Sequence, residues 1–135
     1  MKLNKTERES VVKYRLERAN STLAEAVSNM ENCCWHAAAN RLYYACFYAV
    51  CALLINNGHA TRTHNGVFSL LGEHFVVTGL ISKEQNQFYR RVLELRLTGD
   101  YDDFIEFTEK ELLPLIEPAE QFIKTIENLI NEKSI

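Results

Sequence analysis

NRLYYACFYAV, residues 40–50, is the stretch of sequence that decides the fold. Two polar residues are followed there by a run of apolar and aromatic ones. The segment around it, residues 32–56, has three strongly polar members between its ends, namely His36, Asn40 and Arg41. A helix that is apolar nearly all round is buried on most sides. We therefore expect it either at the centre of a helical bundle or covered by a second subunit.

Arg41 needs a partner, because a guanidinium is costly to leave unpaired away from water. In a functional interpretation, Asn40 and Arg41 line a polar cleft and meet phosphate or the carboxylate of a partner. In a structural interpretation, Arg41 pairs with an acidic residue of the same chain, for which Asp100 is the candidate, and Asn40 ties helices together. Either way, we expect the two residues to hold the central helix near the corner at residues 96–101.

Helical spacing continues on the N-terminal side of this segment. Thr6 and Glu9 have the spacing of a capping box and predict where the first helix begins. Apolar residues then recur every three or four positions as far as Met30. This pattern predicts an amphipathic helix that faces the core.

The C-terminal side also has helical spacing. We expect a short third helix capped by Thr63, and a fourth helix capped by Ser82 that ends at Gly99.

Thr108 and Glu111 predict the start of the last helical segment. We expect a kink or break at its prolines, with Pro118 near the start of the final stretch. No segment alternates convincingly, so no strands are expected. The fold class is therefore all-α, as an up-and-down bundle of four to five helices that forms a single domain over residues 1–135.

Charge is distributed unevenly along the chain. Residues 1–99 carry 12 Lys and Arg against 8 Asp and Glu, whereas residues 100–135 carry 3 against 10. The net charge of −3 argues against extended nonspecific binding of nucleic acid, which needs many phosphate contacts, and no DNA partner is expected. A small basic cleft built from arginines is still compatible with this balance.

The remaining composition favours a cytoplasmic protein without a membrane partner. The N-terminal residues are polar, and the longest apolar run, residues 42–55, is too short for a typical membrane span. The four cysteines form no Cys-x-x-Cys pair, and Cys33 with His36 lacks a second ligand pair. We therefore expect no metal and no cofactor.

Four stretches together carry a family resemblance: AAANRLYYACFYAVCALL, THNGV, FVVTGLIS and ELRLTGDYDDF. In this order, over roughly residues 8 to 130, the chain resembles the HEPN domain, in particular the small stand-alone bacterial and archaeal proteins of that kind. The resemblance implies a bundle of four to five helices that is usually a homodimer. It also implies a frequent partner, a minimal nucleotidyltransferase, with which such proteins form toxin–antitoxin pairs.

Many HEPN domains are metal-independent ribonucleases whose signature is an arginine followed, after four to six residues, by a histidine. Counted from Arg96, those positions hold Tyr101, Asp102 and Asp103, so the histidine is missing. The resemblance therefore supports the fold of the family more strongly than its ribonuclease activity. His64 is the candidate to replace the missing group, because imidazole can move a ribose proton near neutral pH.

The candidate catalytic residues are accordingly Arg96, Asp100 and His64, and the candidate binding residues are Arg41, Asn40, Arg96 and Tyr101. The arginines would hold phosphate, Asp100 would orient an arginine, and Tyr101 would stack or donate a hydrogen bond. Tyr101 is also a candidate for nucleotide modification by the partner enzyme. A purely structural interpretation makes Arg96, Gly99 and Asp100 an ordinary helix terminus.

Two hypotheses of function follow. The first is an RNA- or nucleotide-binding component of a toxin–antitoxin or defence system, with metal-independent endoribonuclease activity as its enzymatic form. The alternative is a noncatalytic interaction module that docks a nucleotidyltransferase. The missing histidine favours the alternative.

Overall fold

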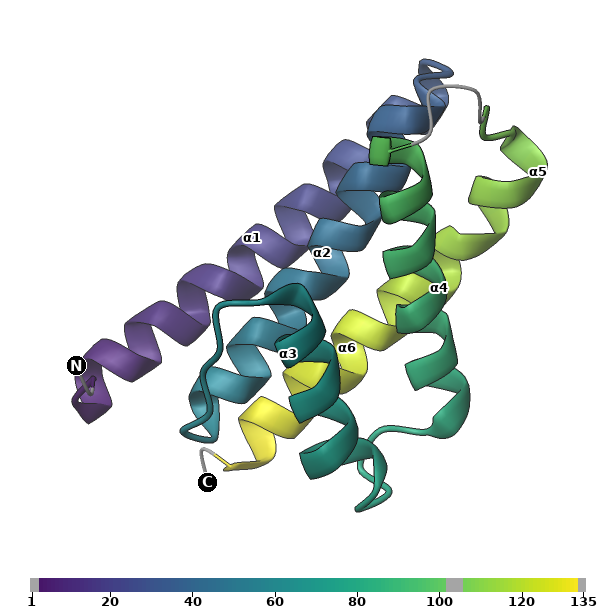
Figure 1. Ribbon diagram of the computed structural model, residues 1–135. Helices are drawn as coiled ribbons and strands as arrows, with labels where there is room; N and C mark the ends of the chain where they lie inside the picture. The colour runs from purple at the N-terminus through teal and green to yellow at the C-terminus, as the bar shows by residue number, and fades with distance from the viewer. Residues whose placement is uncertain (1–2, 102–105, 134–135) are drawn as a thin grey trace.

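The computed structural model describes residues 3–101 and 106–133 of the chain. All regular structure in this part is helical, which confirms the predicted all-α fold (Figure 1). The helices are α1 (Lys5–Glu31), α2 (Trp35–Asn56), α3 (His64–Leu71), α4 (Lys83–Tyr101), α5 (Glu109–Leu112) and α6 (Ile116–Lys133). A π-helical turn, η1 (Gly72–Val76), extends α3, and a 3-10 turn, η2 (Leu113–Leu115), joins α5 to α6.

The α2 helix occupies the centre of the bundle, as its apolar sequence predicts. It packs against α1, α3, α4, α5 and α6, and Leu42, Tyr43 and Val50 are fully buried on it. By length and composition α2 could cross a membrane, but most of its apolar stretch is buried inside the protein. This burial is typical of the core helix of a soluble protein.

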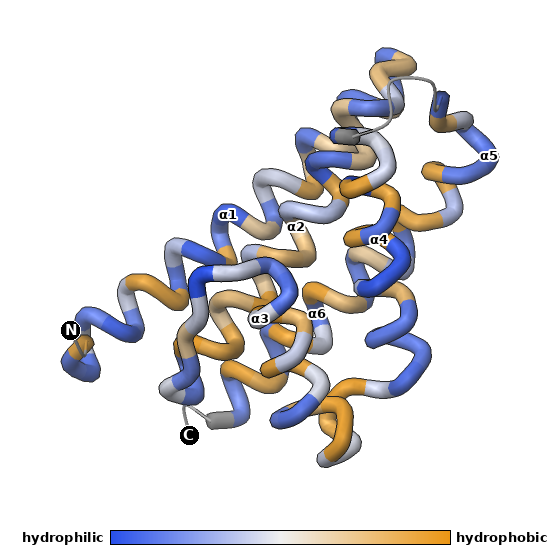
Figure 2. The backbone as a smooth tube through the Cα atoms, viewed as in Figure 1, coloured by the Kyte–Doolittle hydropathy of each residue, from blue (hydrophilic) through white to orange (hydrophobic). Residues whose placement is uncertain are grey.

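The α1 helix begins earlier than predicted. The capping residue is Asn4, whose side chain accepts a hydrogen bond from Glu7 N at 2.8 Å, while Glu7 Oε1 accepts one from Asn4 N at 3.2 Å. The predicted pair of Thr6 and Glu9 was wrong, because the same spacing occurs two residues earlier and asparagine caps a helix as well as threonine does. The helix alternates between hydrophilic and hydrophobic segments along its length (Figure 2), and its buried stripe includes Val12 as expected.

The turn between α1 and α2 forms at Cys33, whose φ of 57° places it in the left-handed region. Therefore α2 begins at Trp35, three residues after the predicted start. The α3 helix begins as predicted, with the Thr63 hydroxyl accepting a hydrogen bond from Gly66 N at 2.8 Å. The Ser82 hydroxyl similarly accepts from Gln85 N at 3.1 Å at the start of α4.

The end of α4 differs from the prediction. The helix continues through Gly99 to Tyr101 instead of ending at the glycine. Gly99 serves packing, because a Cβ atom at this position would lie 2.8 Å from Cε2 of Phe107 and 3.6 Å from Nδ1 of His36. The Phe107 ring therefore occupies the space that a side chain at position 99 would need.

The prolines break the C-terminal segment as predicted. The Thr108 hydroxyl and Glu111 form the expected capping box at the start of α5. Pro114 lies in the 3-10 turn η2, and Pro118 is the third residue of α6. Since proline lacks an amide hydrogen, it is tolerated in a first helical turn, where that donor has no helical partner.

Candidate functional site

The candidate site is built on an aromatic cluster that α2 and α3 form together. The rings of Tyr43, Tyr44 and Phe47 on α2 surround His64, the first residue of α3, with ring-centroid distances of 5.6, 5.9 and 4.6 Å to the imidazole. The Tyr43 hydroxyl and His64 Nδ1 share a hydrogen bond of 2.6 Å. The tautomer of the imidazole decides which of the two is the donor. The cap at Thr63 fixes where α3 starts and thereby where the imidazole lies.

Arg96 of α4 adds a cation to this cluster. Its guanidinium carbon lies 5.7 Å from the centroid of the Tyr43 ring and 5.5 Å from that of Tyr44. Its Nε lies 2.9 Å from Oδ2 of Asp100, one helical turn later. The contact is short, but Nε lacks an aligned hydrogen-bond partner among the described residues, so we treat it as an ion pair. The Arg96 side chain is 15% exposed, so it lies mostly among its neighbours and is accessible only in part.

Arg41 contacts the same tyrosine from another direction. Its guanidinium carbon lies 5.2 Å from the centroid of the Tyr44 ring. Its Nη2 donates to Oδ1 of Asn40 at 2.7 Å, and its Nη1 lies 3.7 Å from Oε2 of Glu25. Tyr44 therefore connects the two arginines that were predicted to bind phosphate.

The predicted pairing of Arg41 with Asp100 was wrong. Asp100 pairs with Arg96 instead, because residues four apart on one helix lie side by side without any help from tertiary packing. Arg41 instead forms an ion pair with Glu25 of α1 and donates a hydrogen bond to the neighbouring Asn40.

The surroundings of the cluster favour the neutral forms of His64 and Tyr43. Burial, followed by the positive charge of Arg96, lowers the pKa of His64. Burial raises the pKa of Tyr43 well above its ordinary value. The site therefore combines two permanent cations with a neutral imidazole and a protonated phenol. Such a set can bind an anion and move a proton.

The structure thus brings together Asn40, Arg41, His64, Arg96 and Asp100. Tyr101 ends α4, and its side chain lies outside the described residues. The residues missing from the predicted site are Tyr43 and Tyr44, which were assigned to packing alone. Their pairing directly after Asn-Arg was a visible signal, but sequence does not show which cations the rings contact.

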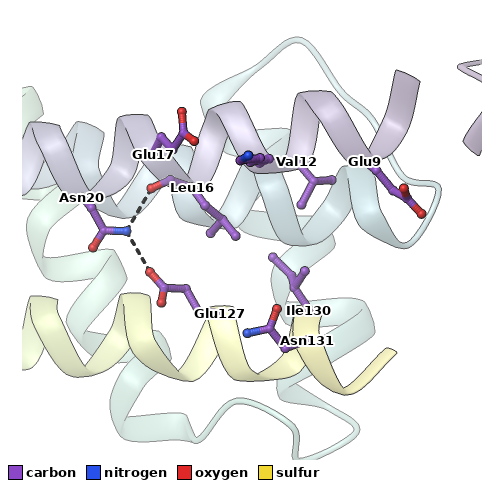
Figure 3. Close-up of a pocket in the computed structure, with 9 residues that line it drawn as sticks. Glu9, Val12, Leu16, Glu17, Asn20, Glu127, Ile130 and Asn131 are labelled. Atoms are coloured by element: carbon purple, nitrogen blue, oxygen red, sulfur yellow. Dashed lines mark hydrogen bonds between the residues drawn. The ribbon is translucent and has the colours of Figure 1, made fainter. Parts of the chain in front are cut away.

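Other features of the described residues do not add to this site. No group of three or more His, Cys, Asp or Glu side chains in that part of the chain could hold a metal ion. A groove of about 620 Å³ lies between α1 and α6 (Figure 3). It is lined by the apolar residues Val12, Leu16 and Ile130 and by polar residues that are mainly glutamates and asparagines. The groove shares no lining residue with the aromatic cluster.

Comparisons with known proteins place the chain in a family. The HEPN domain model matches residues 12–129. A UPF0332 protein of Thermotoga maritima is 40% identical over 126 residues, which cover 93% of this chain and 96% of that protein. Two proteins of Methanocaldococcus jannaschii that are named as toxins are also similar. One is 32% identical and covers 96% of each chain, and the other is 29% identical and covers 89% of this chain and 82% of its own. The chain belongs to the HEPN domain family.

Proposed function

We propose that the protein is a toxin-like HEPN protein that binds RNA at the cluster of Arg41, His64 and Arg96. The observation that carries the proposal is the position of two guanidiniums and a neutral imidazole around Tyr43 and Tyr44. Guanidinium groups match phosphate, and aromatic rings stack on unpaired bases. The toxin names of two relatives support the toxin-like part of this proposal.

In the enzymatic form of the proposal, RNA is cleaved without a metal ion. His64 removes the proton of a ribose 2′-hydroxyl, and the resulting oxygen attacks the adjacent phosphorus. The bond from phosphorus to the 5′-oxygen breaks, and that oxygen takes a proton from water. Arg41 and Arg96 stabilise the negative charge that develops on the phosphate. Asp100 acts as a positioning residue, because it pairs with Nε of Arg96 and leaves the terminal nitrogens for the ligand.

Cleavage of purified cellular RNA in the presence of EDTA tests this proposal. We expect the His64→Ala variant and the Arg96→Gln variant to lose activity by about 100-fold or more, since one positioned base or donor contributes about that much. Arg91→Gln is the control, because Arg91 is an exposed arginine on α4, roughly 140° around the helix from Arg96. Activity that is unchanged in Arg96→Gln would contradict the site assignment.

The alternative function is a noncatalytic module that docks a minimal nucleotidyltransferase as the antitoxin partner. The observation in its favour is the absence of a histidine at the signature positions after Arg96, which hold Tyr101, Asp102 and Asp103. Copurification with the product of the adjacent gene, together with no cleavage and no binding of RNA, would establish it over the first proposal.

We also propose that the protein works as a cytoplasmic homodimer. The surface available for this contact is not the aromatic run of α2, which is largely covered by other helices of the same chain. Large exposed apolar side chains lie elsewhere among the described residues, and the most exposed are Tyr14, Val77 and Leu80. Light scattering at micromolar concentration tests the dimer, and a monomeric mass would contradict it.

A further inference from the structure

A second pair of arginines lies beside the candidate site. Arg15 and Arg18 of α1 approach the Tyr48 ring of α2, with guanidinium carbons 6.0 and 5.4 Å from its centroid. Tyr48 is one helical turn after Tyr44, and the two ring centroids are 5.9 Å apart. Both rings are only partly buried. Arginine and tyrosine contacts therefore continue across α2 from α4 to α1.

We call this set the arginine track, and it consists of Arg15, Arg18, Tyr48, Tyr44, Arg41 and Arg96. Among the described residues, the carboxylates paired with its arginines are those of Glu25 and Asp100, in a protein whose net charge is −3. Concentrating cations around aromatic rings on an acidic protein leaves a local surface that attracts a polyanion.

We propose that the arginine track holds a single-stranded RNA segment that flanks the nucleotide bound at His64. In this arrangement Arg15 and Arg18 contact phosphates of the flanking segment, and an unpaired base stacks on Tyr48. The inference rests on the proposed function, because it extends the same RNA beyond the reacting nucleotide. A single strand fits the track better than a duplex does, because paired bases keep their faces inside the helix stack.

A second copy of the chain fits the same surface poorly. Most homodimers are symmetric, so a twofold contact centred here would bring the four guanidiniums of each copy together and offset them, among the described residues, with the carboxylates of Glu25 and Asp100 alone. Like charges brought together in this way repel each other. RNA instead supplies phosphates for the arginines and base faces that can stack on the tyrosine rings.

Glu25 provides a test of the proposal in which a substitution is expected to increase RNA affinity. Its carboxylate is half exposed and lies 3.7 Å from Arg41, and its charge also contributes to the raised pKa of Arg18 after the larger effect of Tyr48. Glu25 therefore competes with phosphate for two arginines of the track. Replacing it with glutamine should strengthen RNA binding, which a merely structural residue would not do.

The experiment measures the affinity of fluorescent oligouridines of about two and about eight nucleotides for the full-length protein. In the double variant Arg15→Gln/Arg18→Gln, we expect weaker binding of the longer RNA and no change for the shorter one. The slope of log affinity against log salt should fall by about 1.4, since each phosphate contact to a single strand contributes about 0.7. Tyr48→Leu should weaken the longer RNA by about 5- to 150-fold, the range measured for lost base stacking, while Tyr48→Phe should not.

Arg91→Gln is again the matched control, because it removes one exposed arginine outside the track. Equal losses for both RNA lengths in the double variant would overturn the inference, as would unchanged binding of the longer RNA. Unchanged or weaker binding in Glu25→Gln would also overturn it. If the double variant instead lost mass in light scattering at unchanged RNA affinity, the track would be a subunit interface. Failure of wild-type protein to bind either RNA would remove the proposed function itself.

Discussion

The two sides of α1 differ in chemistry although they belong to one helix. One side contributes Arg15 and Arg18 to the arginine track, where cations lie against tyrosine rings. The other side faces the groove between α1 and α6, where Val12 and Leu16 lie among polar residues that are mainly glutamates and asparagines (Figure 3). The net charge of the chain describes neither surface. The ligand that each can accept is set by the local arrangement of side chains.

The two regions also differ in how their polar groups are satisfied. In the groove, Asn20 Nδ2 donates to Oε1 of Glu127 at 2.8 Å and to the carbonyl of Leu16 at 3.0 Å. In the track, the buried Nε of Arg96 lies close to Asp100 without an aligned hydrogen bond among the described residues. Because Nε is buried, a ligand of the track would reach Arg96 through the terminal nitrogens of its guanidinium.

Replacement of Gly99 should produce the largest change in stability and would test how tightly the end of α4 is packed behind the track. A Cβ atom at this position would lie 2.8 Å from the Phe107 ring. We expect Gly99→Ala to lower the free energy of unfolding by about 1–3 kcal/mol, as overpacking does. The measurement is thermal or urea unfolding.

Gly72→Ala is the matched control for that substitution. Gly72 has φ −60° and ψ −50°, and an added Cβ would meet nothing within 4 Å. It should stabilise the protein by about 0.4–1 kcal/mol, because alanine restricts the unfolded chain. Equal effects at the two glycines would contradict the packing role of Phe107.

The two arginines on Tyr44 should differ in their contribution to stability. Arg96 is 15% exposed and contacts two rings and Asp100, whereas Arg41 is 27% exposed and its ion pair is longer. We expect Arg96→Gln to cost about 1–2 kcal/mol and Arg41→Gln less than about 1 kcal/mol. Urea unfolding of both variants tests this. A larger loss of unfolding free energy in Arg41→Gln than in Arg96→Gln would contradict the expected order of the two arginines.

His64, which lies beside the track, should make the free energy of unfolding depend on pH. Burial and Arg96 lower the pKa of His64 in the folded protein below its unfolded value of about 6.5. The unfolded state then binds more protons, so this contribution to stability is present above about pH 6.5 and is lost as pH falls toward the folded pKa. His64→Gln should flatten this part of the curve of unfolding free energy against pH. A curve identical to that of the wild type would contradict the shift.

Asn20→Ala should have the smallest effect and tests the groove. Both hydrogen bonds of Asn20 are exposed, so water can replace them, and we expect a loss of about 0.5 kcal/mol or less. Affinity for RNA should not change, since Asn20 faces α6 and not α2 (Figure 3). A marked loss of RNA affinity would extend the binding surface to the groove.

Local sequence patterns predicted much of this fold. Thr63, Ser82 and Thr108 cap the helices that they were expected to cap, and Pro118 lies in the first turn of the final helix. Two helix ends were predicted wrongly, one because a neighbouring residue could also cap the helix and one because a contact with a distant residue was involved. Asn4 competed with Thr6 for the start of α1, whereas Gly99 lies inside α4 and leaves room for Phe107, which comes from a later segment.

The charged and polar members of the candidate site were predictable from sequence, but its two tyrosines, Tyr43 and Tyr44, and its pairings were not. Asn40, Arg41, His64, Arg96 and Asp100 were all identified from sequence, whereas the partners of the two arginines were not.

By itself, the sequence determined that α2 is covered on most sides, because a helix that is apolar nearly all round has to be buried. The structure showed that the other helices of the same chain provide this cover. The sequence also determined most helix ends, since caps and prolines act over a few residues. Tertiary structure alone decided that Arg41 and Arg96 share Tyr44 and that Arg15 and Arg18 meet Tyr48. Contacts of this kind depend on how helices are rotated and spaced against each other, which helical periodicity does not specify.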